Sequence, residues 1–373
     1  MKKYKVAFLG LKGLPTIRGT DRVVENIIIN LDKTKFNITI YAMKGYVPQN
    51  YKSKSFKQII LNTIPVKNID MFIYLFWSSV HALFKNYDLI HVHNIDGAFI
   101  IPILNLKYKN RLIATSHGSP QNRDKWNKYV KKYFIAMEKM FLRNSSVITS
   151  VSKPLFEYYK NKSQSAIFYI PNGINIEEKI EIEKIKIILN NFGVDKNFLL
   201  FASGRIIPTK GCHTFLNALK IIEHKDGVVI AGDLSQTNDY KKRIEKLMNE
   251  TNAFYVGLIK IKSELLGLIS LAKYFIFPSE IEAMSMMLLE AASVMTPIIC
   301  SNIPENTTIF GSEDVLFFNT SDEHDLARKL KWAISNPDKM KTKSLNAYNK
   351  VKENYLWSDI TKRYENLYKK VLK

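Results

Sequence analysis

Two acidic residues in the second half of the chain have the type and spacing expected of a site for a hydroxyl-rich ligand. Glu282 and Glu290 lie in PSEIEAMSMMLLEAASVMTPIICS, residues 278–301, where a short strand is followed by a helix predicted to begin just after Glu282. Eight helical residues make slightly over two turns, so we expect both carboxylates on one face, about 12 Å apart along the axis. One could accept hydrogen bonds from hydroxyls at the mouth of a cleft and the other from hydroxyls deeper inside.

The start of this predicted helix would add backbone donors to the acidic pair. The N–H groups of Ala283, Met284 and Ser285 would lack partners within the helix, and the helix dipole would favour an anion in front of them. Such donors beside hydroxyl-binding carboxylates suit a sugar diphosphate. Ordinary amphipathic helices also carry two glutamates at this spacing, so this segment alone leaves both interpretations open.

A basic, glycine-containing loop supplies the second signal. In FASGRIIPTKGCHTFL, residues 201–216, Gly204-Arg205 and Lys210-Gly211 lie between a predicted strand and a predicted helix. Arg205 offers a planar fork that binds phosphate through two hydrogen bonds, and Lys210 offers a compact point charge. A single basic loop could be a solvated turn. Two such elements at strand ends of the same domain favour one shared anion site.

Few sequence features point to a metal. No Asp-x-Asp occurs, which argues against a metal-bridged donor site, and we expect neither a metal nor another cofactor. In DLIHVHN, residues 88–94, we expect His91 and His93 to point to opposite sides of a strand and to line a cleft or support the fold. The charge of an anionic leaving group would then be balanced by Arg205, Lys210 and the helix N-terminus.

The elements that must position these residues alternate along the chain. Short β-branched runs such as KVAFLG, NITIYA and RLIATSHG, and later FLLFASG, GVVIAGD and YFIFPS, are separated by longer segments of helical period. This pattern predicts parallel sheets covered by helices on both faces, in which ligands bind beyond the carboxyl ends of the strands. The segments after the predicted strands are Gly10–Gly19, His91–Asn94, His117–Gly118, Pro171–Gly173, Gly204–Gly211, Gly257 and Ser279–Glu282.

The chain is long enough for two such sheets. Its 373 residues exceed what one core usually organises. The rhythm of strands stops at 174–193, a stretch rich in Glu, Lys and Ile, and we place a domain junction at its start. The last segment, 355–373, has apolar residues at a spacing that predicts one amphipathic helix.

Positive charge is concentrated in the first half. The formal net charge is +21, and residues 1–175 contain 27 Lys and Arg against 9 Asp and Glu, whereas residues 176–373 contain 28 against 25. Such asymmetry raises the local concentration of anionic partners, namely nucleic acid, anionic lipid or a phosphorylated substrate. A general excess of surface lysines is the alternative, although that excess should have affected both halves.

Two segments of the first half raise the question of a membrane. Residues 71–84, MFIYLFWSSVHALF, are too few to span a bilayer, and we expect a buried helix, with a segment inserted in one leaflet as the alternative. Residues 125–143 mix lysines with aromatic residues and could lie at a membrane interface or cover the sheet. The two cysteines, Cys212 and Cys300, and the lack of a visible export signal favour the cytoplasm.

These motifs together resemble a known family. GR…KG at 204–211, VG at 256–257, PS..E.......EA at 278–291 and TP at 296–297 are similar to the group 1 domain of family 4 glycosyltransferases, which retain the anomeric configuration. In the first half the resemblance runs through the glycine loop, DLIHVHN, HG at 117–118 and PNGIN at 171–175. It covers essentially the whole chain, and GLKGLPTIRGTDRVVE resembles members from bacterial capsule, O-antigen and related surface-polysaccharide gene clusters.

The resemblance implies an α/β protein of the GT-B fold, with two Rossmann-like doubly wound domains facing each other across a cleft. Residues 1–173 would bind the acceptor, residues 174–352 the nucleotide sugar, and 353–373 would form a helix that crosses back to the first domain. Arg205 and Lys210 would neutralise the departing diphosphate, Glu290 would bind ribose hydroxyls, and Glu282 would hold hydroxyls of the donor sugar.

In the first half, the resemblance implies that the loop through Gly19 closes over the diphosphate and that His117 contacts the sugar. Two positions depart from the family pattern. Thr20 follows Gly19 where a second glycine is common, and Met295 precedes Thr-Pro where a glycine is usual. Neither departure removes a charge that the reaction needs.

The sequence thus predicts a glycosyltransferase that moves a sugar from a nucleoside diphosphate to a lipid-linked glycan at the inner face of the cytoplasmic membrane. A nucleotide-sugar epimerase of the same fold and a non-catalytic subunit that binds glycan or lipid are the alternatives, and nucleic-acid binding is a more distant one. The base, the sugar and the linkage do not follow from the sequence.

Overall fold

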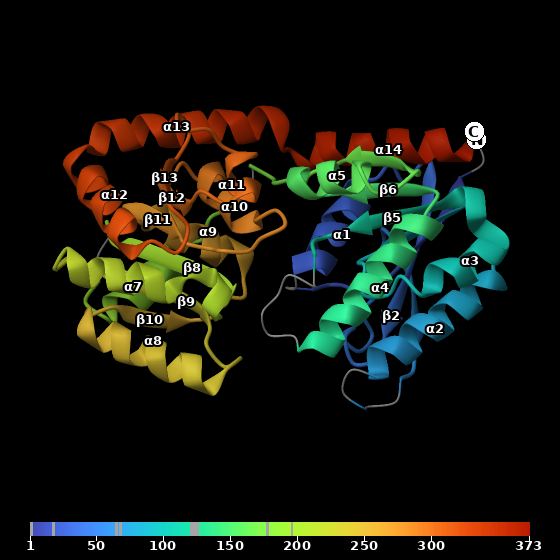
Figure 1. Cartoon of the computed structure of the whole chain (residues 1–373), viewed down its shortest axis with the longest axis horizontal. Helices are drawn as coiled ribbons and strands as arrows, with labels where there is room; N and C mark the ends of the chain where they lie inside the picture. Colours follow the sequence, from blue (N-terminus) through green and yellow to red (C-terminus); the bar gives the residue numbers. More distant parts are fainter. Residues whose placement is uncertain are drawn as a thin grey trace. The chain divides into compact units, whose positions relative to one another are not determined.

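The computed structural model of the chain describes residues 3–16, 19–63, 66, 69–119, 127–176, 179–194 and 197–373. The chain divides into two compact units, each an α/β layer structure (Figure 1). Unit 1 comprises Met1–Gly173 together with Trp357–Lys373, and unit 2 comprises Ile174–Leu356. Lys125 and Trp126, which open the basic and aromatic segment singled out in the sequence, lie outside the described residues.

Unit 1 is built on a parallel sheet of seven strands in the order β3-β2-β1-β4-β5-β6-β7. Its strands are β1 (Tyr4–Leu9), β2 (Phe36–Met43), β3 (Lys57–Leu61), β4 (Leu89–His93), β5 (Leu112–Ser116), β6 (Val147–Ser150) and β7 (Ala166–Tyr169). Its helices are α1 (Gly19–Asn30), α2 (Ile69–Leu83), α3 (Ile100–Tyr108) with the 3-10 turn η1 (Lys109–Arg111), α4 (Lys128–Asn144), α5 (Lys153–Lys160) and α14 (Trp357–Leu372). The central strands β4 and β5 are buried along their whole length, as expected of a sheet with helices on both faces.

Unit 2 repeats this plan with six parallel strands in the order β10-β9-β8-β11-β12-β13. Its strands are β8 (Leu199–Arg205), β9 (Val228–Asp233), β10 (Phe254–Gly257), β11 (Tyr274–Phe277), β12 (Ile298–Ser301) and β13 (Leu316–Phe318). Its helices are α6 (Ile182–Asn190), α7 (Cys212–Ile221) preceded by the 3-10 turn η3 (Pro208–Lys210), α8 (Asn238–Glu250), α9 (Lys262–Leu271), α10 (Met286–Ser293), α11 (Pro304–Thr307), α12 (Glu323–Ser335) and α13 (Pro337–Asn354).

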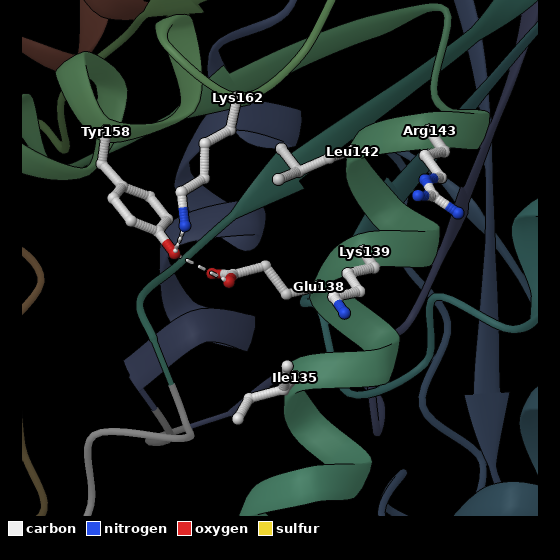
Figure 2. Close-up of a pocket in the computed structure, with 7 residues that line it drawn as sticks. All are labelled: Ile135, Glu138, Lys139, Leu142, Arg143, Tyr158 and Lys162. Atoms are coloured by element: carbon white, nitrogen blue, oxygen red, sulfur yellow. Dashed lines mark hydrogen bonds between the residues drawn. The ribbon is translucent and has the colours of Figure 1, made fainter.

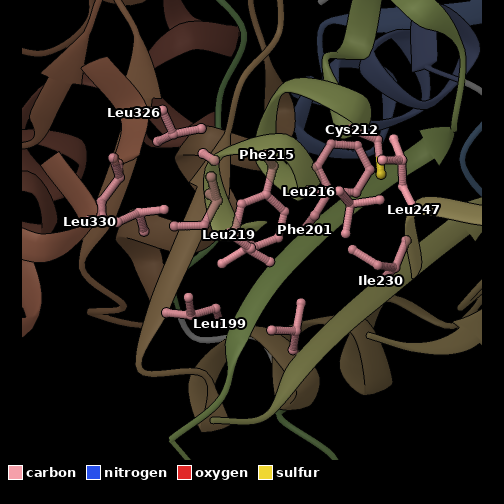
Figure 3. Packing of buried hydrophobic residues seen from close by; sticks show 14 of the residues in the cluster. Leu199, Phe201, Cys212, Phe215, Leu216, Leu219, Ile230, Leu247, Leu326 and Leu330 are labelled. Atoms are coloured by element: carbon pink, nitrogen blue, oxygen red, sulfur yellow. The ribbon is translucent and has the colours of Figure 1, made fainter. Parts of the chain in front are cut away.

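The core of unit 2 forms where α7 and α12 cover the middle of the sheet. Phe215 and Leu219, four residues apart on α7, face Leu199 and Phe201 of β8, and Leu326 of α12 closes the cluster (Figure 3). The spacing of four in the helix and two in the strand places each apolar set on one face. Both described cysteines belong to buried regions and are free thiols rather than a disulfide.

Both sheets reverse their strand order at the first strand of the unit. In unit 1 the chain runs outward from β1 through β2 and β3, then returns to add β4 on the other side of β1. In unit 2 the same happens between β8 and β11. At such a reversal the loops that follow the two neighbouring strands turn in opposite directions and leave a crevice, where ligands of doubly wound sheets bind.

The last helix, α14, belongs to unit 1 although it comes after all of unit 2. Ile360, Tyr364 and Tyr368 recur every four residues, are buried, and lie on the face that packs on unit 1. The hydroxyl of Tyr368 lies 2.8 Å from Nδ1 of His91 in β4, and Glu365 accepts a 2.8 Å hydrogen bond from the backbone N–H of Asp32. The end of the chain therefore completes the first core.

The strands predicted from β-branched runs are confirmed, and the two edge strands β3 and β13 are additions that the sequence analysis missed. Residues 71–84 form most of α2, but the expectation of a buried helix is wrong for one of its faces, because Phe72, Phe76 and Trp77 are exposed. Within the described parts of the chain, no helix combines the length and apolar character needed to cross a bilayer.

Candidate functional site

The two most informative predicted residues of unit 2 are in direct contact. Nζ of Lys210 donates a 2.5 Å hydrogen bond to Oε1 of Glu282, and the two side chains retain 21% and 13% of their exposure. Oε1 also accepts a 2.7 Å bond from the hydroxyl of Ser279. Lys210 follows β8 and Glu282 follows β11, so this ion pair lies at the crevice where the strand order of unit 2 reverses.

Local backbone constraints fix this contact. Gly211 has φ +69°, a left-handed conformation, and a Cβ at this position would lie 2.1 Å from the carbonyl oxygen of Pro278. The backbone N–H of Glu280 donates a 2.9 Å bond to the carbonyl of Thr209. The loops after β8 and β11 are therefore joined backbone to backbone, which is why glycine is required at position 211.

The end of strand β12 is hydrogen-bonded to the loop that follows β11. The hydroxyl of Ser301, at the end of β12, donates to the carbonyl of Ser279. The amide of Asn306 in turn donates a 3.0 Å bond to the carbonyl of Ser301, and Asn306 is fully buried. Such a buried, bonded chain of polar groups fixes the position of the Ser279 loop before any ligand binds.

Arg205, the other predicted cation, ends β8 and is exposed. Its partner in the register of β9 is Asp233, whose carboxylate accepts hydrogen bonds from the backbone and hydroxyl of Ser235 at 2.8 and 2.6 Å. Hydrogen bonds from Ser235 lower the pKa of Asp233, and the positive charge of Arg205 lowers it further. The edge thus carries a cation beside an anion at β8 and β9 as well as the Lys210–Glu282 pair.

The prediction that Glu282 and Glu290 share a helix is wrong. Helix α10 begins at Met286, after Ser285 in an extended conformation, so Glu282 and Ala283 precede it in a loop. The physical reason is tertiary as well as local, since the hydroxyl of Ser279 and the distant Lys210 both hold the Glu282 carboxylate outside the helix.

The backbone donors of this helix shift with its start. The first N–H groups without partners inside α10 belong to Met286, Met287 and Leu288, with Ser285 as the residue that precedes the helix, rather than to Ala283, Met284 and Ser285 as predicted. Glu290 lies in the last turn of α10 and its side chain is fully buried.

The sequence analysis missed Glu305, which opens the short helix α11 after β12. Burial raises the pKa of Glu305, and the negative charge of Glu282 raises it further because the two carboxyl groups lie near each other. The available signal was its position, because NIPEN follows directly on the strand IICS, whereas the segments chosen after strands stopped at residue 282.

In unit 1 the crevice between β1 and β4 holds the predicted glycine loop. Gly10 has φ +91°, and a Cβ there would lie 2.1 Å from the carbonyl oxygen of His93. The side-chain amide of Asn94 donates a 3.2 Å bond to the carbonyl of Gly10. Gly19 is the first residue of α1, and a Cβ added there would meet open space. Ile17 and Arg18 of the predicted loop lie outside the described residues.

Three histidines lie side by side at this edge of unit 1. The rings of His91 and His93 are 4.0 Å apart between centroids, and Nδ1 of His93 lies 3.0 Å from Nε2 of His117. The prediction that His91 and His93 point to opposite sides is wrong, because residues two apart in a strand face the same side. His91 is further bonded to Thr115 through Nε2 at 2.6 Å.

These histidines are neutral at ordinary pH. Burial lowers the pKa of His117 to about 3. Burial and the charge that His117 would carry lower the pKa of His91 to about 3 as well. Burial, followed by the charges that His91 and His117 would carry, holds the pKa of His93 well below its usual range. Neutral imidazoles donate and accept hydrogen bonds, which suits the binding of hydroxyl groups. Among the residues described, no group of three His, Cys, Asp or Glu is arranged to hold a metal ion.

A cavity of about 500 Å³ lies elsewhere, between α4 and α5 of unit 1 (Figure 2). Tyr158 donates a 3.2 Å hydrogen bond to the carboxylate of Glu138, and Lys162 donates a 2.7 Å bond to the hydroxyl of Tyr158. None of the residues predicted to bind or transfer a sugar lines this cavity, so it is not the candidate site.

Comparison with known families covers both halves of the chain. The sequence model described as "Glycosyl transferases group 1" matches residues 184–350, and the one described as "Glycosyltransferase Family 4" matches residues 17–178. The first match includes the Lys210–Glu282 pair, and the second includes the three histidines.

Among curated relatives, the capsular polysaccharide biosynthesis glycosyltransferase CapH of Staphylococcus aureus is 28% identical over 248 residues. These residues are 60% of this chain and 62% of CapH, so the chain spans about three fifths of that protein. UDP-Gal:alpha-D-GlcNAc-diphosphoundecaprenol alpha-1,3-galactosyltransferase of Escherichia coli is 25% identical over 83% of this chain and 82% of its own length.

Solved structures share the fold at lower identity. Sucrose-phosphate synthase from Thermosynechococcus elongatus superposes with a TM-score of 0.82 at 20% identity and 99% coverage of both chains. Alr3699/HepE of Anabaena, solved in complex with UDP-glucose, superposes with a TM-score of 0.77 at 15% identity, over 97% of this chain and 99% of its own. The similarity extends over both units and supports the GT-B fold.

Proposed function

This chain belongs to the group 1 glycosyltransferases of family 4, and we propose that it transfers one sugar from a nucleoside diphosphate to a lipid-linked glycan, with retention of configuration, in the synthesis of a bacterial surface polysaccharide. The observation that carries the proposal is the contact of Lys210 with Glu282 at the crevice of unit 2. This contact supports the proposal because a cation and a carboxylate, residue types suited to phosphate and to hydroxyl groups, lie at the crevice where doubly wound sheets bind nucleotides.

The diphosphate would be held by positive groups of unit 2. Arg205 is the exposed cation, and Lys210, which already bonds Glu282, would share its remaining two N–H donors with the phosphate oxygens. The first N–H groups of α10, at Met286, Met287 and Leu288, add partial positive charge. In this role Ser285 and its neighbours Ala283 and Met284 line the approach to the helix.

The sugar would be held by carboxylates and by unit 1. Glu282 keeps its Oε2 oxygen for a donor hydroxyl while its Oε1 bonds Lys210 and Ser279. We assign the ribose hydroxyls to Glu290. His117 would hydrogen-bond the sugar as a neutral imidazole, with His93 fixing its orientation through the 3.0 Å contact. Gly19 would bring the N-terminus of α1 to the donor.

In the reaction that we propose, the bond from the anomeric carbon to the diphosphate breaks as a bond to the acceptor oxygen forms on the same face. The proton of the acceptor hydroxyl passes to the departing diphosphate, so that no separate base is required. Arg205 and Lys210 stabilise the charge that grows on the diphosphate, and preorganised groups of this kind give large rate effects. We propose that no metal takes part.

A lipid-linked acceptor is supported by two observations. The relative from Escherichia coli is named for a diphosphoundecaprenol-linked acceptor. The first 175 residues also carry a large positive excess, which attracts diphosphate groups and anionic membranes. We therefore place the enzyme at the inner face of the cytoplasmic membrane.

Thermal unfolding with a panel of UDP-, GDP-, ADP- and dTDP-sugars tests the donor site. A ligand at 100 times its dissociation constant adds about 2.7 kcal/mol to the free energy of unfolding, so one base should raise the melting temperature while the others do not. If the Arg205→Ala variant loses this rise in melting temperature, the nucleotide sugar binds beside Arg205. No stabilisation by any nucleotide sugar would contradict the proposal.

NMR of the selected donor separates transfer from its alternatives. With an undecaprenyl-diphosphate glycan, we expect a product with the donor's anomeric configuration. Isomerisation of the donor without acceptor would indicate an epimerase, and the absence of both transfer and slow hydrolysis would indicate a binding subunit.

A further inference from the structure

Helix α2 exposes an apolar face that nothing in the described chain covers. The exposed residues are Ile69, Phe72, Phe76 and Trp77, followed by Phe84 just after the helix, and Trp77 and Phe84 are 54% and 81% exposed. Their spacing of three, four and seven or eight residues places them on one side of the helix. We call these five residues the apolar stripe.

The opposite side of α2 is apolar as well. Tyr74, Leu75 and Ala82 are buried in the core of unit 1. The ionisable side chains of α2 are those of Asp70, Tyr74 and His81. A helix that is apolar all round is normally covered on every side, so the stripe is a surface that requires a partner.

The stripe continues onto the neighbouring helices. Phe72 stacks on Phe99, just before α3, with ring centroids 4.3 Å apart. Nζ of Lys107 in α3 donates to the carbonyls of Leu83 and Lys85 at 2.9 and 2.8 Å, beside Phe84. α3 itself exposes Leu106.

Helix α4 extends this surface further. The hydroxyl of its Tyr133 donates a 2.8 Å bond to the carbonyl of Asp96, in the loop before α3. α4 exposes Tyr129, one turn before Tyr133. Helix α3 contacts both α2 and α4, and the three helices are neighbours in unit 1, coloured blue to green in Figure 1.

Cations surround the apolar residues. The described basic residues from α2 through α4 are Lys85, Lys107, Lys109, Arg111, Lys128, Lys131, Lys132, Lys139 and Arg143. The described acidic residues of the same stretch are Asp70, Asp88, Asp96 and Glu138, of which Glu138 is buried. A second copy of this surface would meet it with like charge, whereas an anionic bilayer would meet it with opposite charge.

We propose that this surface of α2, α3 and α4 docks on an anionic lipid bilayer. The apolar stripe enters the interfacial layer, where Trp and Phe side chains are favourable, and the exposed cations of η1 and α4 contact the headgroup phosphates. The inference rests on the proposed function in that it brings the enzyme to a lipid-linked acceptor.

Vesicle sedimentation with the full chain tests the apolar part. The parent should bind vesicles of phosphatidylglycerol and phosphatidylcholine, and Phe84→Asp combined with Trp77→Ala should weaken binding at least about tenfold, because two inserted aromatic groups are lost. Ile187→Asp is the matched control, since Ile187 in α6 of unit 2 is 65% exposed and should leave binding unchanged.

A charge series tests the basic part. Lys132→Gln with Lys139→Gln in α4 should weaken binding about fivefold for each charge removed. Lys331→Gln with Lys341→Gln, two exposed lysines of unit 2, should have no such effect. Equal loss in both pairs would mean that net charge alone binds the vesicle, and equal binding to vesicles of phosphatidylcholine alone would overturn the electrostatic part.

Self-association is the competing outcome. If the parent sediments as a dimer without vesicles and Phe84→Asp makes it a monomer, the stripe pairs with a second copy and the proposal fails. Stabilisation by a nucleotide sugar keeps the two proposals separate. Variants that lose vesicle binding should still show a higher melting temperature with the nucleotide sugar. A parent protein that binds vesicles but is not stabilised by any nucleotide sugar would contradict the proposed function and leave the docking proposal intact.

Discussion

The two sheets reverse strand order at corresponding places but carry different chemistry there. At β8 and β11 of unit 2, the carboxyl edge holds charged groups, with Lys210 bonded to Glu282 and Arg205 beside Asp233. At β1 and β4 of unit 1, it holds neutral groups, with His93 bonded to His117. The same architecture thus presents charges at one edge and uncharged donors and acceptors at the other.

The difference follows from what surrounds each edge. The Lys210 and Glu282 side chains keep partial contact with solvent, so a charged pair is tolerated. His91 is covered by Thr115 of β5 and Tyr368 of α14, and burial of both His91 and His93 disfavours their charged forms. A charged edge suits a diphosphate, and a neutral edge suits sugar hydroxyls, whose binding does not require compensation of charge.

The largest expected effect is at the charged edge. Lys210→Ala should lower kcat/KM by roughly 30- to 5000-fold, because removing one partner of a partly desolvated charge pair costs about 2–5 kcal/mol. Steady-state transfer with the donor selected by thermal shift measures it. Activity within a factor of three of the parent would show that the Lys210–Glu282 contact is structural only.

Gly211→Ala should destabilise the charged edge without removing a charge. The left-handed backbone and the Pro278 carbonyl, 2.1 Å from the added Cβ, should lower the free energy of unfolding by at least about 2 kcal/mol. Urea denaturation measures the loss. Gly204→Ala, with open space and no left-handed backbone, should stay within about 0.5 kcal/mol, and equal losses in the two variants would argue against a locked loop.

The neutral edge predicts a dependence of stability on pH. The pKa of His91 is about 3 in the folded protein and about 6.5 in an unfolded chain, so its contribution is present above pH 6.5 and is lost as pH falls toward 3. His91→Gln should therefore make the fall in unfolding free energy below pH 6 shallower by up to about 1.4 kcal/mol per pH unit.

Urea denaturation between pH 7 and pH 5 measures this slope. His324→Gln, which changes an exposed residue of α12, should leave the slope of the parent unchanged. A slope equally steep in His91→Gln and the parent would mean that His91 is not the group that takes up a proton on unfolding.

The smallest effect is expected for an ion pair of similar length away from both edges. Lys220 and Glu250 are 2.7 Å apart but both exposed, and such pairs contribute about 0–1 kcal/mol. Lys220→Ala should thus leave transfer unchanged and stability nearly so. If its loss of activity approached that of Lys210→Ala, position at the crevice would not be what distinguishes the two pairs.

Much of the architecture follows from the sequence because buried parallel strands have a strong signature. KVAFLG, RLIATSHG and FLLFASG each contain an uninterrupted apolar run, and each forms a strand of one of the two sheets. β3 and β13 were missed because edge strands are short and partly exposed, so KQIIL and LFF lack that contrast with their surroundings.

The site was predictable in its residue types and less so in its geometry. Lys210 and Glu282 were singled out by their place after strands, and their contact depends on backbone bonds between the two loops that no local pattern reveals. The start of α10 was misplaced because a distant lysine holds Glu282 outside the helix. Glu305 is near Glu282 only through tertiary folding.

The return of α14 to unit 1 has a consequence for how the chain is made. Its Tyr368 and Trp357 complete the first core, with Trp357 packed against Gly173, yet residues 174–356 must be translated in between. At a translation rate of about 5–20 residues per second, roughly 10 to 40 seconds pass between synthesis of the first half and synthesis of α14. During this time α14 does not yet cover His91 and its neighbours. Over that interval the nascent chain exposes a surface that chaperones recognise, and a stalled ribosome would release a product with an open core.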